Sequence, residues 1–171
     1  RITSGAFSLE AEAELGRYMY EIERISDDSL RRILFFAALC ILEDVSYTRK
    51  DGQYLRWDYR SGRRVGKKLF HKGTIESFTP AICAKLDQIA GDICGDQLRL
   101  ADLFGEQRWG EVQLLKGSCL DILPTLEDES FDGIITSPPY CNRYDYTRTY
   151  ALELAMMGIG EEEIRALRQA M

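Results

Sequence analysis

The residues with the clearest capacity for chemistry are Ser137, Pro138, Pro139 and Tyr140, which follow one another directly. Proline fixes the backbone φ angle and donates no hydrogen bond, so two prolines in a row predict a stiff loop with rigidly held carbonyl oxygens. The hydroxyl of Ser137 adds a further acceptor, and a planar amine needs two acceptors, one for each N–H. The ring of Tyr140 can lie flat against an aromatic ring. These four residues therefore predict a site for a planar aromatic amine.

The elements around this loop are predicted from apolar runs and turn residues. Residues 131–136 read as a buried strand that ends at the loop, and residues 112–115 read as an earlier short buried strand. Between them lie a glycine turn at 117–119 and a short helix at 120–126. Two apolar strands with a short crossover predict a parallel sheet in an α/β fold. Open sheets of this kind bind ligands at the carboxyl ends of their strands, which is where the loop falls.

The run from 112 to 154 resembles the catalytic region of the S-adenosylmethionine-dependent DNA amino-methyltransferases. The resemblance rests on Thr-Ser-Pro-Pro-Tyr after a strand, preceded by Leu-Leu-Lys-Gly-Ser-Cys-Leu-Asp-Ile-Leu-Pro-Thr-Leu. A wider run, 43–57, resembles what precedes the loop in some bacterial members. These enzymes methylate the exocyclic amine of cytosine (N4) or adenine (N6). Serine at the first loop position is commonest in the cytosine-N4 group, which favours cytosine without deciding the base.

The resemblance implies catalytic roles for the four loop residues. The target base is flipped out of the duplex into the pocket, and Tyr140 stacks on it. The side chain of Ser137 and the carbonyl of Pro138 accept hydrogen bonds from the two amine N–H groups, with Pro139 completing the loop. This arrangement keeps the nitrogen lone pair aimed at the methyl group and stabilises the positive charge that develops. No covalent enzyme intermediate is implied.

The resemblance also places the cofactor, S-adenosylmethionine, and here the chain departs from the family. Gly117, Ser118 and Cys119 stand where the family contacts the cofactor adenine, but members often carry Asp where this chain has Ser118. The family's Phe-x-Gly-x-Gly loop is absent from the chain. We therefore expect part of a longer protein that lacks its cofactor half. Its partners are then DNA and either the missing part of the fold or a second copy of the chain.

A strongly basic segment is hidden in an acidic chain. The 171 residues carry 22 Lys and Arg against 28 Asp and Glu, a net charge of -6. Within 49–72, nine basic and two acidic residues give +7, which leaves 13 basic and 26 acidic residues, or -13, elsewhere. Aromatic residues interleave with these positive charges, a pattern typical of nucleic-acid contacts. A solvated surface loop is the alternative. The predicted nucleic-acid contacts are Arg49, Lys50, Arg56, Arg63, Arg64, Lys67 and Lys68.

Composition bounds the remaining possibilities. With 45% hydrophobic and 29% charged residues the chain can bury a core, which excludes a disordered chain. The longest apolar run, 33–42, is about half of the ~20 residues that a membrane span needs, so no membrane helix is predicted. The five cysteines form no C-x-x-C pair, which predicts reduced thiols, no metal site and a cytoplasmic protein.

Helical patterns fill most of the rest. Ser8 predicts a cap for a helix to about residue 25, with Leu9, Ala13, Met19 or Tyr20, and Ile22 facing inward. An apolar helix at 30–44 should be deeply buried. Further helices are predicted to start near 79 and to run from 146 to 157. The fold class is α/β, a partial Rossmann-like methyltransferase fold with a helical N-terminal region. We expect residues 1–110 to form that region, with the basic loop at 47–73, and 111–171 to form the catalytic strand-loop-helix part.

The predicted function is transfer of a methyl group from S-adenosylmethionine to a base amine in DNA, as in restriction-modification. An RNA base amino-methyltransferase is the first alternative, because it uses a similar loop. A catalytically silent nucleic-acid-binding piece is the second. A protein-glutamine methyltransferase also uses a related loop but has no use for the basic segment. Asp145, just after the loop, is predicted either to line the base pocket or to cap the next helix.

Overall fold

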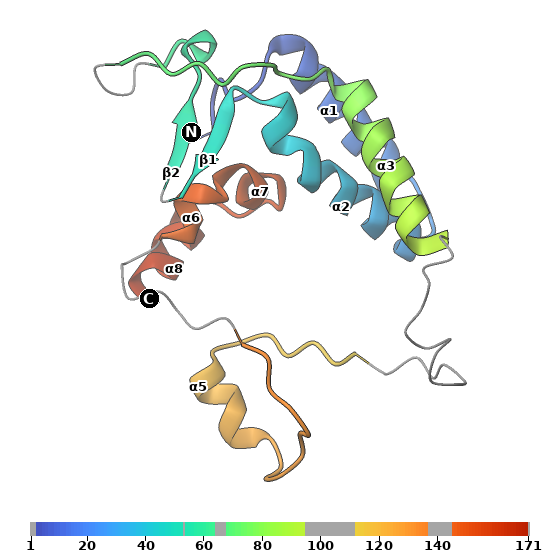
Figure 1. The fold of residues 1–171 in the computed structure, drawn as a ribbon, viewed down its shortest axis with the longest axis vertical. Helices are drawn as coiled ribbons and strands as arrows, with labels where there is room; N and C mark the ends of the chain where they lie inside the picture. Colours follow the sequence, from blue (N-terminus) through green and yellow to red (C-terminus); the bar gives the residue numbers. More distant parts are fainter. Residues whose placement is uncertain (1–2, 53, 64–67, 95–111, 137–144, 171) are drawn as a thin grey trace. The chain divides into compact units, whose positions relative to one another are not determined.

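The structure is a computed structural model, and it describes most of the chain (Figure 1). The described residues are 3–52, 54–63, 68–94, 112–136 and 145–170. They fall into two compact units, one drawn from 1–95 and 143–171 and the other from 96–142. This grouping differs from the predicted boundary near residue 110, because the last helices pack with the N-terminal region. The predicted catalytic loop, 137–140, lies outside the described residues.

Three helices form the main body of the first unit and lie side by side (Figure 1). They are α1 (Leu9–Glu23), α2 (Asp28–Val45) and α3 (Phe78–Cys94). The Ser8 side chain accepts a hydrogen bond from the backbone N–H of Ala11 at 3.1 Å, which confirms the predicted cap. Asp27 caps α2 in the same way through the N–H of Leu30 at 3.0 Å. All three helices appear where the sequence predicts them.

The core lies where α2 meets α3. Ala37, Ala38, Ile41 and Val45 of α2 are buried against a cluster that includes Ile82 of α3. The small alanines let the two helices approach closely. The prediction that α2 is deeply buried is confirmed for its second half, whereas its first half is more exposed.

Helix α1 presents a different face to the core from the predicted one. Leu9 is 89% exposed and Ala13 is exposed as well, so their predicted inward positions are wrong, while Ile22 is buried as predicted. Of the two alternatives Met19 and Tyr20, Met19 is the less exposed. The buried side follows Ala11, Leu15 and Ile22, with Leu15 packed against the core cluster. These positions recur at helical spacing, as residues on one side of a helix do. Leu9, the first helical residue, is on the opposite side.

The basic segment contains a β-hairpin that the sequence analysis missed. Strands β1 (Thr48–Asp51) and β2 (Tyr54–Trp57) pair antiparallel, with Asp51 opposite Tyr54. The connection begins at Gly52, whose φ of 57° lies in the left-handed region that glycine adopts without strain. Asp-Gly between alternating residues is a hairpin signal and was available in the sequence. A single 3₁₀ turn, η1 (Tyr59–Ser61), follows the hairpin.

The C-terminal residues return to the first unit as short helices. They are α6 (Tyr146–Thr149), α7 (Ala151–Met156) and α8 (Glu161–Ala170). The predicted helix 146–157 is confirmed with a break at Tyr150. Helix α6 packs against β2, and α7 packs against α2 (Figure 1). The segment that follows the predicted catalytic loop is thus anchored to the basic hairpin.

The second unit holds the two predicted strands, and neither forms a strand. Residues 112–115 and 131–136 have no regular structure, and Ile135 is fully exposed at 104%. The strand predictions are therefore wrong, because a strand needs a neighbour for its backbone hydrogen bonds and the described residues of this unit supply none. The predicted short helix is confirmed as α5 (Cys119–Ile122) with the 3₁₀ turn η2 (Leu123–Thr125). Nowhere in the described ranges is a helix both long and apolar enough to span a membrane.

Candidate nucleic-acid interface

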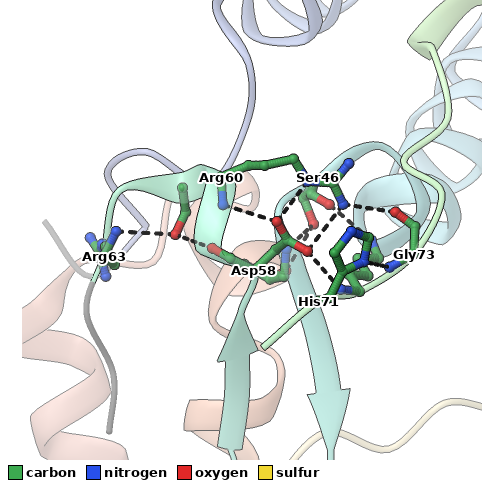
Figure 2. A network of polar contacts seen from close by, with 9 residues as sticks. Ser46, Asp58, Arg60, Arg63, His71 and Gly73 are labelled. Atoms are coloured by element: carbon green, nitrogen blue, oxygen red, sulfur yellow. Dashed lines mark hydrogen bonds and ion pairs between the residues drawn. The ribbon is translucent and has the colours of Figure 1, made fainter. Parts of the chain in front are cut away.

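A buried carboxylate organises the residues after the hairpin (Figure 2). Asp58 is 0% exposed, and its oxygens accept hydrogen bonds from Arg60 Nε at 2.7 Å and Arg60 Nη2 at 3.0 Å. The backbone N–H groups of Arg60 and Lys72 donate to the same carboxylate at 2.9 and 2.6 Å. The hydrogen bond from Arg60 holds the pKa of Asp58 well below its usual range, although burial alone raises it. Asp58 is therefore ionised at neutral pH and ties residue 72 to the end of the hairpin.

Lys72 attaches the same segment to the end of α2. Its ammonium donates hydrogen bonds to the carbonyl oxygens of Glu43 and Ser46, the latter at 2.9 Å. These carbonyls lie at the C-terminus of α2, where the helix dipole favours a positive charge. Burial lowers the pKa of Lys72, and the nearby acidic groups oppose that shift. The loop from 58 to 73 is thus fixed at both ends by buried polar contacts. No local sequence pattern predicted these contacts.

The inward face of the hairpin is joined to α6 and α7. Lys50 Nζ lies 2.5 Å from the carboxylate of Glu153 and 4.5 Å from the ring centre of Tyr150. The hydroxyl of Thr149 donates to the carbonyl of Gly52 at 3.3 Å. Lys50, predicted as a nucleic-acid contact, is therefore half-buried and engaged within the chain.

Two predicted arginines are held against aromatic rings. The guanidinium of Arg56 lies 4.2 Å from the ring centre of Phe70 and also pairs with Asp51 at 3.2 Å. The guanidinium of Arg63 lies 3.9 Å from the ring centre of Trp57. Stacking of this kind is attractive and restricts the arginine side chain to fewer rotamers. The interleaved aromatic residues therefore orient the basic side chains.

The remaining predicted contacts divide into two groups. Arg49 and Lys68 are exposed, and within the described part of the chain they make no ion pair. Arg64 and Lys67 lie outside the described residues. The exposed positive charge that the structure describes on this segment is thus carried mainly by Arg49, Arg56 and Lys68.

Asp145 caps the helix that follows the predicted catalytic loop. Its carboxylate accepts hydrogen bonds from the N–H and hydroxyl of Thr147 at 3.1 and 2.5 Å. It also pairs with Arg148 at 3.0 Å and Arg168 at 3.1 Å. Burial alone raises the pKa of Asp145, but the hydrogen bonds of Thr147 and the two arginines lower it on balance. Of the two roles predicted for Asp145, the structure shows the helix cap.

The predicted cofactor residues form an exposed turn. Ser118 caps α5 by accepting a hydrogen bond from the N–H of Leu120 at 3.2 Å, and Gly117 and Cys119 flank it. A Cβ atom on Gly117 would lie 3.0 Å from Ile122 Cδ1, so a larger residue there would require a small shift of the Ile122 side chain. All three residues are exposed. The described residues 112–136 therefore do not by themselves enclose a cofactor.

Over its whole length the chain is similar to proteins named as Type II methyltransferases. It is 51% identical over all 171 residues to the Type II methyltransferase M.AvaI of Nostoc sp. and to that of Anabaena variabilis. It is 41% identical, over 99% of its length, to the Type II methyltransferase M.BsoBI of Geobacillus stearothermophilus. The resemblance predicted from the sequence is thereby confirmed, and such relatives imply a Rossmann-like fold.

The chain spans only 35% of the length of these curated relatives. No family model matches the chain, and no solved structure matches it significantly.

Proposed function

We propose that the protein takes part in the methylation of a base amine in DNA, with cytosine N4 favoured over adenine N6. The observation that carries the proposal is the 51% identity, over every residue of the chain, to proteins named Type II methyltransferases. The Ser-Pro-Pro-Tyr run falls within the matched length and is the part whose chemistry suits an aromatic amine. S-adenosylmethionine supplies the methyl group when it is bound.

The four loop residues act on the base rather than on the methyl donor. The hydroxyl of Ser137 and the carbonyl of Pro138 accept hydrogen bonds from the two amine N–H groups, which leaves the nitrogen lone pair free to react. Tyr140 stacks on the flipped base and fixes the plane of the base against its ring, while Pro139 keeps the loop stiff. Positioning of this kind lowers the barrier without a covalent intermediate. Cys119 and Cys141 have no nucleophilic role in the reaction.

The basic hairpin supplies contacts to the DNA backbone. Its positive charge is concentrated in an otherwise acidic chain, and phosphate contacts give both affinity and register on a duplex. The hairpin is bonded to α6 and α7, and α6 begins six residues after Tyr140 in the sequence.

The proposal is tested by incubating the protein with duplex DNA and radiolabelled S-adenosylmethionine, followed by nucleoside chromatography. We expect label in N4-methylcytosine, loss of label with Tyr140→Ala, and partial retention with Tyr140→Phe, which keeps the ring. Label in N6-methyladenine would correct the base. Label in tRNA but not in DNA would overturn the proposal in favour of RNA methylation.

A catalytically silent nucleic-acid-binding piece is the second candidate. It is favoured by the exposed cofactor turn, since residues 112–136 alone do not enclose a cofactor. Calorimetry with S-adenosylmethionine distinguishes the two: a silent piece gives no heat of binding, whereas a methyltransferase does.

A further inference from the structure

The register of the hairpin places two arginines directly opposite each other. Arg49 of β1 pairs with Arg56 of β2, and both side chains are on the exposed face, where Asp51 and Tyr54 also lie. The other face carries Thr48 and Leu55, which are buried against the body of the unit. Like charges at directly opposed positions destabilise a strand pair. An exposed Arg–Arg pair therefore costs the hairpin stability unless an anion lies between the two guanidinium groups.

Among the described residues, an acidic partner is found for only one of these charges. Asp51 pairs with Arg56 at 3.2 Å, and both groups are about half exposed, so the bond is weak and open to exchange. Within the described residues, Arg49 makes no ion pair. The ring of Phe70 supports the guanidinium of Arg56 from one side, which orients it before any ligand arrives.

We propose that Arg49 and Arg56 together form a clamp for one phosphate of the DNA backbone. This inference rests on the proposed function for the identity of its ligand and goes beyond it by selecting two of the seven predicted basic residues. Lys50, in the same strand but on the opposite face, is excluded from the clamp because Glu153 and Tyr150 hold its ammonium.

The geometry suits a phosphate. Directly opposed Cα atoms in an antiparallel pair lie roughly 4.5–5.5 Å apart, so two arginine side chains easily reach the same anion. Guanidinium groups donate two parallel hydrogen bonds to phosphate oxygens, which lysine cannot do. A two-stranded ribbon is also narrow enough to enter the major groove, whose walls are lined by phosphates.

The test is the salt dependence of duplex binding by the 171-residue chain, measured by fluorescence anisotropy between roughly 50 and 200 mM salt. The double variant Arg49→Met, Arg56→Met is expected to bind about tenfold or more weakly and to lower the salt slope by about 0.9, the value for one phosphate. Replacing both arginines by lysine should keep the slope but weaken binding, because the bidentate contacts are lost.

The control is Arg17→Met, which removes an exposed arginine from α1. It should leave the salt slope unchanged.

Four results would overturn the clamp. They are no duplex binding by the parent chain, an unchanged slope in the double methionine variant, a fall of about 1.8 that indicates two separate phosphates, and an equal fall in the Arg17→Met control. The readout is DNA affinity rather than methyl transfer. Failure of the methylation assay and failure of the clamp are therefore separate outcomes.

Discussion

Arg60 and Asp58 are joined by two parallel contacts, Nε to Oδ1 at 2.7 Å and Nη2 to Oδ2 at 3.0 Å, and only one residue lies between them in the chain. The arginine also donates to the carbonyl of Gly73 at 2.7 Å. One side chain thus bonds the start and the end of the loop that follows the hairpin (Figure 2). The contact has consequences for stability that can be measured.

Asp58→Asn is expected to destabilise the chain by about 1.5–3 kcal/mol, the range for hydrogen bonds to a charged group. The amide cannot accept from both Arg60 and Lys72 as the carboxylate does, and one of its donors would face them. Urea denaturation measures the effect. Asp51→Asn is the matched control, because its exposed ion pair should be worth less than about 1 kcal/mol. Equal losses in the two variants would show that the buried network adds nothing.

The same group makes stability depend on pH. Because the pKa of Asp58 is lower in the folded chain than in the unfolded chain, its contribution is fully present above the unfolded value of about 3.9. The contribution is lost as pH falls through the lower folded value. Denaturation followed across the acid range should therefore show a decline in stability below about pH 4 that is smaller in Asp58→Asn. Identical profiles for the two proteins would contradict this assignment.

Lys50 and Glu153 should be energetically coupled. Either single change, Lys50→Met or Glu153→Gln, leaves a half-buried partner without its counter-charge. The double variant should therefore lose less stability than the sum of the two single losses. We expect a coupling energy of about 0.5–3 kcal/mol in a double-mutant cycle on unfolding. The exposed pair of Arg24 and Glu21 on α1 is the control and should show little coupling. Additive changes at Lys50 and Glu153 would mean that the hairpin is held to α7 by packing alone.

Truncation of two isoleucines should change the free energy of unfolding by very different amounts. Ile41 is 1% exposed in the core between α2 and α3, so Ile41→Ala should cost about 2–5 kcal/mol. Ile135 is fully exposed, so Ile135→Ala should change the free energy of unfolding by less than about 0.5 kcal/mol. Thermal or chemical melting of the two variants measures the difference. A large loss at Ile135 would indicate that residues 131–136 are buried against another surface in solution.

Much of the local structure was predictable from the sequence. The caps at Ser8 and Asp145, the helices around the core and the short helix after Ser118 all depend on contacts within three or four residues, which composition and spacing record directly. The resemblance to methyltransferases was also readable from the sequence, because it rests on one contiguous run of residues. The turn at Gly52 carried a hairpin signal that could have been used.

Other features were decided only by tertiary structure. Which side of β1 faces solvent, and hence which basic residues are engaged by Glu153 or left exposed, depends on packing against helices far away in the chain. The Asp58 network joins residues from three segments, and no local pattern encodes that. The apolar runs at 112–115 and 131–136 also show that local sequence is not enough. Apolar character favours a strand, but only a neighbouring strand can supply its backbone hydrogen bonds.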